Sequence, residues 1–232
     1  MKGLKNWKLQ NGLILVYEDR DLMIVDKPPG LLTIGTLKEK TKTVHFILSE
    51  YLSQGRGKGK IFVVHRLDRE TSGLLVFAKS EKIKYSLQEN WDKVKKKYLA
   101  IIAGKIEPKN GVFESLLAEN DAHVVYATGD PLTGKPAKTE YRVLKESKSH
   151  SLLEINLHTG RKHQIRVHLA DAGFPVIGDQ KYGIKDKNQK RLALHAYSLE
   201  FDHPFSGKSV KINSEIPGIF QRMFGDYFSK TK

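Results

Sequence analysis

Short apolar runs recur along most of the chain, and their pattern predicts a protein built mainly from strands. Runs of this kind, rich in β-branched and aromatic residues and bounded by Gly, Pro, Asn or Asp, are typical of strands. We expect strands at residues 13–17, 22–26, 61–64, 74–78, 94–103, 111–117, 123–128, 137–146, 151–158, 191–201 and 209–213.

Between these runs, apolar residues three and four positions apart predict helices. Thr43 can cap the first, and Gly173 followed by Pro175 should end the third. We expect helices at residues 44–52, 80–91, 161–172 and 217–228. Neither an internal repeat nor a clear domain boundary is visible. The order of elements therefore predicts one α+β domain with a large mixed sheet.

Composition narrows the kinds of partner. The 232 residues include 40 Lys and Arg against 26 Asp and Glu, a net charge of +14. Such a surplus indicates an anionic partner such as RNA or DNA, although a membrane surface or no partner are alternatives. No run approaches the ~20 apolar residues of a spanning helix, and residues 1–10 lack a signal-peptide core. We therefore expect no membrane attachment and a cytoplasmic location.

The sequence offers little support for thiol chemistry, a metal site or a nucleotide-binding P-loop. The chain has no cysteine, which excludes disulfides, thiolate catalysis and cysteine-bound metal. His158, His163 and His168 would point about 140° apart on a helix, so we expect no metal site. Residues 129–135 resemble a P-loop, but Pro136 replaces the required Ser or Thr. Residues 53–60 form a basic loop, either a solvated linker or a segment that closes over a phosphate backbone.

A polar loop between two predicted strands holds the most informative residues. Residues 65–73 separate the apolar runs 61–64 and 74–78, and functional groups are often placed on such loops. Asp68 lies in this loop between Arg66 and Arg69, and nearby cations keep a carboxylate ionised. A salt-bridged turn is the ordinary alternative for an aspartate in a charged loop.

Long motifs point to one family. Residues 65–75 read HRLDRETSGLL, which closely resembles the HRLDxxTSGLL signature of the RluA-type pseudouridine synthases. The related RsuA-type enzymes have Gly where His65 stands. Residues 159–170, TGRKHQIRVHLA, resemble the family's TGRxHQIRxHL motif, which continues through Gly178-Asp179. Shorter similarities lie at residues 24–31, 96–100, 135–141 and 192–199. In all, the resemblance spans residues 13–201.

The resemblance implies a fold and a partner. It implies a large curved, mostly antiparallel sheet flanked by helices, with an RNA cleft across the sheet. We expect a catalytic domain over residues 13–232 after a short extension, residues 1–12. That extension leaves no room for the S4 RNA-binding domain that many RluA-type enzymes carry. The expected partner is ribosomal or transfer RNA. The reaction is redox-neutral, so we expect no cofactor, and a monomer is the default.

Residue roles also follow from the resemblance. Asp68 would be the catalytic carboxylate, acting at C1′, at C6 of uracil or as a base at C2′. Tyr98 would cover the uracil and assist proton removal, and Arg166 would pair with Asp68 and keep it anionic. His65 and Arg66 would hold the strand around a flipped-out uridine, with Arg66 in the vacated space. The remaining expected RNA-binding residues are Arg69, Arg161, His163, Gln164 and Lys97.

Purely structural roles remain open for several of these residues. Tyr98 could be a half-buried strand tyrosine, and His65 and Arg66 could cap the loop. Two other functions also remain open. The charge alone would suit a non-catalytic RNA-binding or RNA-chaperone protein. A glycosidase that releases uracil could use the same carboxylate.

Overall fold

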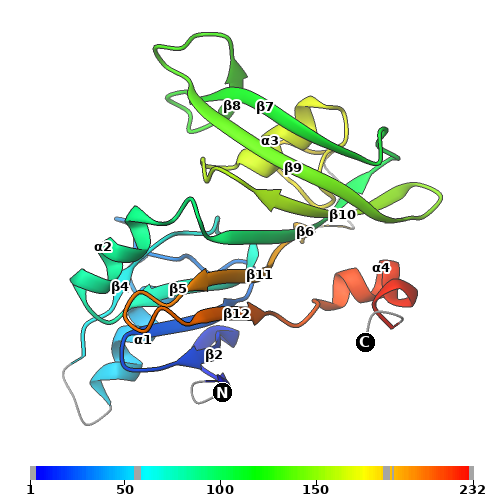
Figure 1. Ribbon diagram of the computed structural model, residues 1–232. Helices are drawn as coiled ribbons and strands as arrows, with labels where there is room; N and C mark the ends of the chain where they lie inside the picture. The colour runs from blue at the N-terminus through cyan, green and yellow to red at the C-terminus, as the bar shows by residue number, and fades with distance from the viewer. Residues whose placement is uncertain (1–3, 55–58, 185–188, 190, 230–232) are drawn as a thin grey trace. The chain divides into compact units, whose positions relative to one another are not determined.

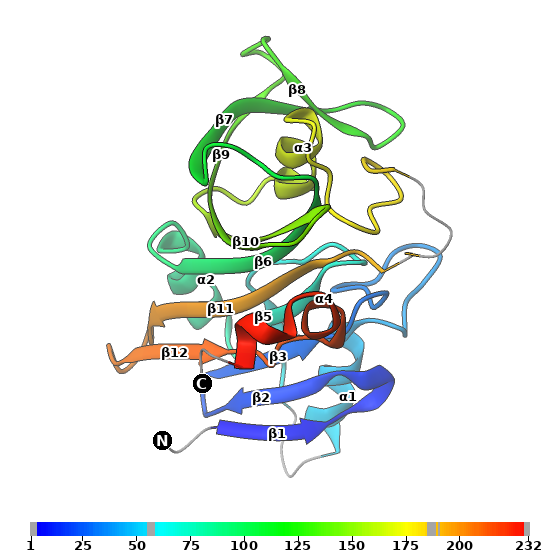
Figure 2. The same ribbon diagram turned by 90° about the vertical axis from the view of Figure 1, so that its right-hand side faces the viewer.

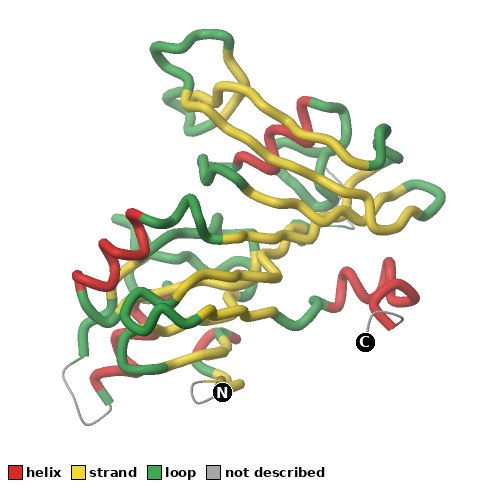
Figure 3. The backbone as a smooth tube through the Cα atoms, in the orientation of Figure 1, coloured by secondary structure: helices red, strands yellow, loops and turns green. Residues whose placement is uncertain are grey.

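The computed structural model describes residues 4–54, 59–184, 189 and 191–229. Residues 55–58, in the middle of the basic loop expected from the sequence, lie outside the described part. The chain divides into two compact units, one of Met1–Val94 with Ser198–Ser214 and one of Lys95–Tyr197 with Glu215–Lys232. Strands predominate over helices in both units (Figure 3).

The first unit is a mostly antiparallel sheet. Its strands follow the order β1-β2-β3-β5-β11, with β4 paired to β5 and β12 paired to β11. Figure 1 labels β2, β4, β5, β11 and β12 of this unit. The strands are β1 (Leu4–Lys8), β2 (Ile14–Glu18), β3 (Leu22–Lys27), β4 (Phe62–Val63), β5 (Ser72–Ala78), β12 (Ser209–Asn213) and the second half of β11 (Leu194–Asp202). A 3₁₀ turn, η1 (Gln10–Gly12), joins β1 to β2.

Two helices belong to this unit, α1 (Val44–Ser53) and α2 (Glu81–Glu89). Each begins at a hydroxyl cap. Thr43 Oγ1 accepts from the N–H of Phe46 at 3.1 Å, and Ser80 Oγ accepts from the N–H of Ile83 at 3.3 Å. These caps satisfy N–H groups that a helix cannot satisfy internally, so they fix where each helix begins.

Strand β5 lies at the centre of the first unit's core, because all seven of its residues are buried. Leu74 and Val76 of β5 pack with Leu22 and Ile24 of β3, and Ile83 of α2 joins the same cluster. Since successive residues of a strand point to opposite faces, both faces of β5 are covered. The loop that ends in β5 is therefore attached to a rigid support.

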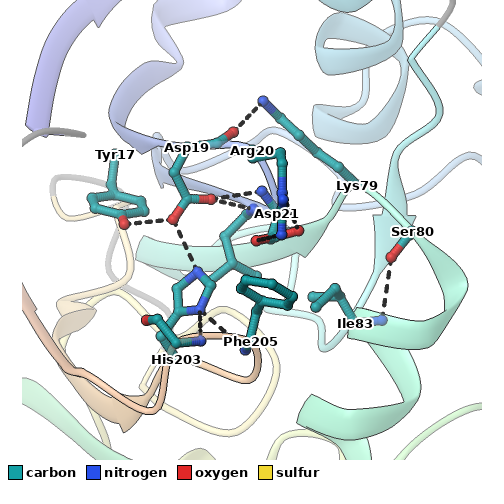
Figure 4. A network of polar contacts seen from close by, with 11 residues as sticks. Tyr17, Asp19, Arg20, Asp21, Lys79, Ser80, Ile83, His203 and Phe205 are labelled. Atoms are coloured by element: carbon teal, nitrogen blue, oxygen red, sulfur yellow. Dashed lines mark hydrogen bonds and ion pairs between the residues drawn. The ribbon is translucent and has the colours of Figure 1, made fainter.

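A polar network joins the β2–β3 turn to the β11–β12 turn (Figure 4). Asp19 Oδ2 accepts from the Tyr17 hydroxyl at 2.6 Å and from His203 Nε2 at 2.9 Å. His203 Nδ1 accepts from the N–H groups of Phe205 and Ser206, so Nε2 carries the proton. Burial raises the pKa of Asp19, but the hydrogen bonds from Tyr17 and from the backbone outweigh burial and hold it below its usual value.

The second unit is a curved antiparallel sheet with a helix against its inner face (Figure 2). Its order is β11-β6-β10-β9-β7-β8, beginning with the first half of β11. The strands are β6 (Lys95–Ala103), β7 (Asn110–Glu119), β8 (Val125–Thr128), β9 (Lys135–Glu146) and β10 (His150–Leu157). The helix is α3 (Gln164–Asp171), and α4 (Gly218–Ser229) also belongs to this unit.

The element predictions agree closely with the structure. Each predicted strand and helix is present, with shifts of a few residues at the ends. Strand β1 was not predicted, and α3 begins at Gln164 rather than near residue 161. The α+β class and the mostly antiparallel pairing are confirmed. Among the described residues, no helix combines the length and the apolar character needed to cross a membrane.

Candidate active site

Asp68 lies on the loop between β4 and β5, and the backbone on both sides of it is anchored. Thr33 Oγ1 donates to the carbonyl of Leu67 at 3.0 Å and accepts from the N–H of Leu67 at 3.3 Å. The N–H of Thr71 donates to the carbonyl of Asp68 at 3.2 Å. Asp68 itself is half-buried. The loop thus presents a partly exposed carboxylate on a fixed backbone.

A buried lysine joins this loop to the segment after β3. Lys27 is 0% exposed, and its ammonium donates to the carbonyls of Pro28, Leu31 and Arg69 at 3.1, 2.8 and 2.9 Å. Burial lowers the pKa of Lys27 to about 8, against the opposing effect of nearby carboxylates, with Glu70 the largest contributor. Lys27 is therefore a buried cation placed directly beneath the Asp68 loop.

Gly30 adds a second connection between the same two segments. Its N–H donates to the carbonyl of Arg69 at 2.8 Å, and Arg69 Nε donates back to the carbonyl of Gly30 at 3.0 Å. Gly30 has φ +84°, a left-handed conformation that favours glycine. The KPPG segment, residues 27–30, is therefore a support for the Asp68 loop.

One histidine and two arginines of the loop differ in position. His65 Nε2 accepts from the N–H of Val76 at 3.0 Å, and its ring lies 4.4 Å from that of Trp91. Arg69 is tied to Gly30, whereas Arg66 is exposed. The His65 side chain accepts a backbone N–H of β5 just beyond the residues that pair with β4, so it has a structural role in the loop. Arg66 and Arg69 are both exposed to a partner, whereas His65 is half-buried.

In the second unit, Gln164 anchors the start of α3. It is 2% exposed, and its Nε2 donates to the carbonyl of Lys138 and to Thr139 Oγ1, both at 2.9 Å. Its Oε1 accepts from Thr159 Oγ1 at 2.7 Å and from the N–H of Arg161 at 3.0 Å. The amide is fully used within the protein. Gln164 therefore holds the TGRKHQ loop in place, and its expected contact with RNA stays a prediction.

Arg166 forms a buried bidentate ion pair with Asp179. Arg166 Nε and Nη2 each lie 2.7 Å from a carboxylate oxygen of Asp179, whose side chain is 1% exposed. Burial raises the pKa of Asp179, but Arg166 and the N–H groups of Tyr182 and Lys181 outweigh burial and hold it below its usual value. This pair fixes the guanidinium plane of Arg166.

Gly178 explains how Asp179 reaches that position. Gly178 has φ +76°, and a Cβ built there would lie 2.0 Å from the carbonyl oxygen of Arg191. No other residue type fits this close approach of two backbone segments. The Gly-Asp pair at the end of the second motif therefore serves to place the carboxylate partner of Arg166.

The strand register places Tyr98 on the inner face of the second sheet. Tyr98 lies opposite Ile155, which lies opposite Tyr141, and Tyr141 shares its face with Thr139 two residues away. Thr139 bonds to Gln164 and, at 2.9 Å, to His168 Nδ1, so this is the face that α3 covers. Tyr98 and Arg166 thus belong to the same layer of the second unit.

Lys97 points to the other face of the same sheet. It lies opposite Asn156, and its ammonium is 3.2 Å from Glu154 Oε1. Arg142 reaches the same carboxylate at 3.1 Å. The structure therefore does not bring Lys97 together with Tyr98, because neighbouring residues of a strand face opposite ways.

His158, His163 and His168 have separate partners. His158 Nε2 lies 3.1 Å from Glu140 Oε2, and His163 Nδ1 lies 2.7 Å from the Tyr182 hydroxyl. His168 contacts Thr139 and, at 3.0 Å, Ser115 Oγ. Burial lowers the pKa of His168 to about 4, so it is neutral at pH 7. His168 fastens α3 to the sheet.

Arg161 is exposed at the start of the TGRKHQ loop, where its Nε donates to the carbonyl of Pro136 at 3.0 Å. The structure thus groups Arg161, His163, Arg166 and Tyr98 around α3 and its preceding loop. Asp68 belongs to the other unit. That Asp68 meets Tyr98 and Arg166 therefore stays a prediction.

Sequence reasoning overlooked three residues of these arrangements. It assigned no role to Lys27, Asp179 or Tyr182, although all three contact expected site residues. Lys27 and Asp179 each lie inside a stretch that resembles the family, and this resemblance was the signal that could have pointed to them. A buried lysine cannot be told from a surface lysine by residue type alone.

Comparison with known proteins gives consistent matches. A family model described as RNA pseudouridylate synthase matches residues 21–171. The chain is 37% identical to ribosomal large subunit pseudouridine synthase D of Nitrosomonas europaea over 218 residues, covering 88% of this chain and 62% of that protein. It is 33% identical over 221 residues to the uncharacterised RNA pseudouridine synthase YhcT of Bacillus subtilis, covering 94% of this chain and 73% of that protein.

Solved structures agree with these sequence matches. Human RNA pseudouridylate synthase domain containing 4 superposes with a TM-score of 0.75 at 25% identity, covering 92% of each chain. Human RNA pseudouridylate synthase domain containing 1 superposes with a TM-score of 0.74 at 26% identity, covering 92% of this chain and 87% of that chain. The fold expected from the sequence is therefore confirmed.

Proposed function

Because the chain belongs to the RNA pseudouridylate synthase family, as its motifs predicted, we propose that it isomerises specific uridines of structured RNA to pseudouridine. The observation that carries this proposal is the HRLDRETSGLL segment, with Asp68 on a loop anchored through Thr33, Lys27 and Gly30. These anchors hold the backbone of Asp68 in one position and leave its carboxylate partly exposed.

The reaction breaks the N1–C1′ bond of a uridine and forms a C5–C1′ bond. The uracil turns between these steps, C5 loses its proton, and N1 gains one. Atoms and electrons balance without an oxidant or reductant, so the proposal includes no cofactor. Asp68 acts on C1′ or C6, or removes a proton at C2′, and the three routes share the need for an ionised carboxylate.

The second unit supplies the other two groups of the proposed site. Tyr98 covers the uracil with its ring and assists removal of the C5 proton. Arg166 pairs with Asp68 and keeps it anionic. The Arg166–Asp179 pair supports this role, because a guanidinium already held in one plane loses less entropy when it binds a further group. Such preorganisation favours catalysis.

A uridine within folded RNA must leave its stack before these groups can reach it, at a cost of a few kcal/mol. The net charge of +14 would offset that cost through phosphate contacts. Arg66 and Arg161 are exposed, and we assign them to the RNA strand around the extruded nucleotide. Arg66 would occupy the space that the uridine leaves.

Ribosomal RNA is the substrate to test first. The relative from Nitrosomonas europaea is named for the large ribosomal subunit, and transfer RNA is the alternative. Transcripts of large-subunit RNA and total transfer RNA would be incubated with the protein and mapped for pseudouridine. We expect pseudouridine at one or a few positions. Release of free uracil would indicate a glycosidase instead, and binding without modification would indicate a non-catalytic RNA-binding protein.

A further inference from the structure

Tyr182 touches two groups of the proposed site at once. Its hydroxyl lies 2.7 Å from His163 Nδ1, and the guanidinium of Arg166 lies 5.1 Å from the centre of its ring. Its own N–H donates to Asp179 Oδ1 at 3.0 Å, which fixes the backbone of Tyr182 relative to the Arg166–Asp179 pair. The tyrosine is thus held where it can influence both His163 and Arg166.

The Tyr182 hydroxyl lies between a backbone N–H and the His163 imidazole. The N–H of Val125 donates to the hydroxyl oxygen at 3.0 Å. A backbone N–H can only donate, so the oxygen acts as the acceptor in that contact. A hydroxyl that accepts one bond can also donate one, and donation to His163 Nδ1 is consistent with the shorter contact of 2.7 Å. In that direction of the bond, Nδ1 is the acceptor and the imidazole proton lies on Nε2.

His163 is held in an unusual backbone conformation next to this contact. It precedes the first residue of α3 with φ +54°, a left-handed value that is uncommon for residues other than glycine. Its ring meets that of Tyr182 edge-on, with centroids 5.4 Å apart and planes at 70°. Strained residues persist where the surroundings over-determine them, and they cluster at functional sites.

We propose that Tyr182 is a positioning residue of the RNA site, whose hydroxyl sets His163 as the Nε2–H tautomer and whose ring supports the guanidinium of Arg166. The proposal rests on the proposed function, in which His163 contacts the RNA and Arg166 acts on the catalytic carboxylate. An imidazole fixed as an Nε2–H donor matches the acceptor oxygens of a phosphate or a base. The hydroxyl of Tyr182 thus affects RNA binding through His163, whereas its ring affects catalysis through Arg166.

Two substitutions separate the hydroxyl from the ring. Tyr182→Phe removes the hydroxyl and keeps the ring under Arg166, whereas Tyr182→Leu removes both. Tyr126→Phe, at an exposed tyrosine of β8, is the matched control. The measurements are the ¹⁵N resonances of the His163 imidazole at about pH 8, where an ordinary histidine is neutral, together with the Kd for an RNA substrate and kcat.

In the wild-type protein we expect Nδ1 to give an unprotonated resonance and Nε2 a protonated one. Tyr182→Phe should mix the tautomers and weaken RNA binding about tenfold, the effect of one lost hydrogen bond, with kcat little changed. Tyr182→Leu should lower kcat as well, and Tyr126→Phe should change neither. The proposal would be overturned by unaltered His163 resonances in Tyr182→Phe or by equal kcat values for the two Tyr182 variants.

The wild-type spectrum keeps the test decisive if the variants do not fold, because a wild-type His163 protonated on Nδ1 would contradict the proposal. The spectrum also separates this inference from the proposed function. A protein that makes no pseudouridine would refute the function and the role at an RNA site. The resonances would still report whether Tyr182 sets the tautomer.

Discussion

The buried ammonium of Lys27 donates a hydrogen bond to the main-chain carbonyl of Arg69, the residue that follows Asp68, at 2.9 Å. The same carbonyl accepts the N–H of Gly30 at 2.8 Å. Strand β3 ends at Lys27 and pairs with β5, the strand that follows the Asp68 loop. The same sheet therefore supports both the lysine and the loop to which it is bonded. The position of the Asp68 backbone therefore depends on a cation that has no contact with solvent.

Replacing Lys27 by Met should destabilise the protein and displace this loop. Buried carbonyls would lose their donor, so we expect the free energy of unfolding to fall by about 1–3 kcal/mol at pH 7. Urea denaturation measures this change. Lys82→Met, at an exposed lysine of α2, is the control and should have little effect. A Lys27→Met protein as stable as the wild type would show that the lysine is not needed.

Lys27 also predicts a pH dependence of stability. Burial lowers its pKa from 10.5 to about 8 in the folded protein. Between pH 8 and pH 10.5 the unfolded chain therefore binds more protons than the folded one, and the free energy of unfolding should rise with pH. This rise should be absent from Lys27→Met. Parallel curves for the two proteins across this window would contradict the assignment.

Asp19 gives a prediction at the acidic end of the pH range. Asp19→Asn removes a carboxylate that accepts from Tyr17, His203 and two backbone N–H groups, and should cost about 1–3 kcal/mol at pH 7. Folding lowers the pKa of Asp19 below 3.8. The difference in the free energy of unfolding between the wild type and Asp19→Asn should therefore be complete above pH 3.8 and disappear as the pH falls through the folded pKa. Denaturation at several acidic pH values tests this, with Asp202→Asn at an exposed neighbour as control.

Breaking the Arg166–Asp179 pair should cause a large loss of stability. Asp179→Asn replaces a bidentate acceptor by a group with one acceptor oxygen beside a buried guanidinium. We expect a loss of about 3–5 kcal/mol and a lower kcat in the protein that still folds. Asp171→Asn, at the C-terminal end of α3, should be neutral or slightly stabilising, because burial raises the pKa of Asp171. Equal stability of the two variants would argue against the pair's importance.

The fold could be predicted from the sequence because most elements carry a clear apolar pattern. Strand β5 is apolar from Leu74 to Ala78 and α1 begins at a hydroxyl cap, so each shows its type locally. Strand β1 lacked such a signal, since it pairs only with β2 and its Trp7 is 53% exposed. The start of α3 was misplaced because His163 adopts a left-handed conformation, which periodicity does not reveal.

The candidate site could be predicted only in part. Motifs singled out Asp68, Tyr98 and Arg166, but not the residues that hold them. The partner of Arg166 follows it by thirteen positions and lies in a turn, outside any helical or strand periodicity. The burial of Gln164 could not be predicted either, because it comes from Lys138 and Thr139, which precede it by a whole strand and loop. Long-range packing of this kind is not encoded in local patterns.

The central claim is that the Asp68 carboxylate makes pseudouridine, and Asp68→Asn tests it most directly. The variant keeps the size of the side chain and removes its charge, and Asp92→Asn, at an exposed aspartate of the same unit, is the matched control. Pseudouridine formed in the substrate RNA is measured together with RNA binding. We predict that Asp68→Asn binds RNA as the wild type does and forms no pseudouridine, while Asp92→Asn does both. Normal turnover by Asp68→Asn would contradict the assignment.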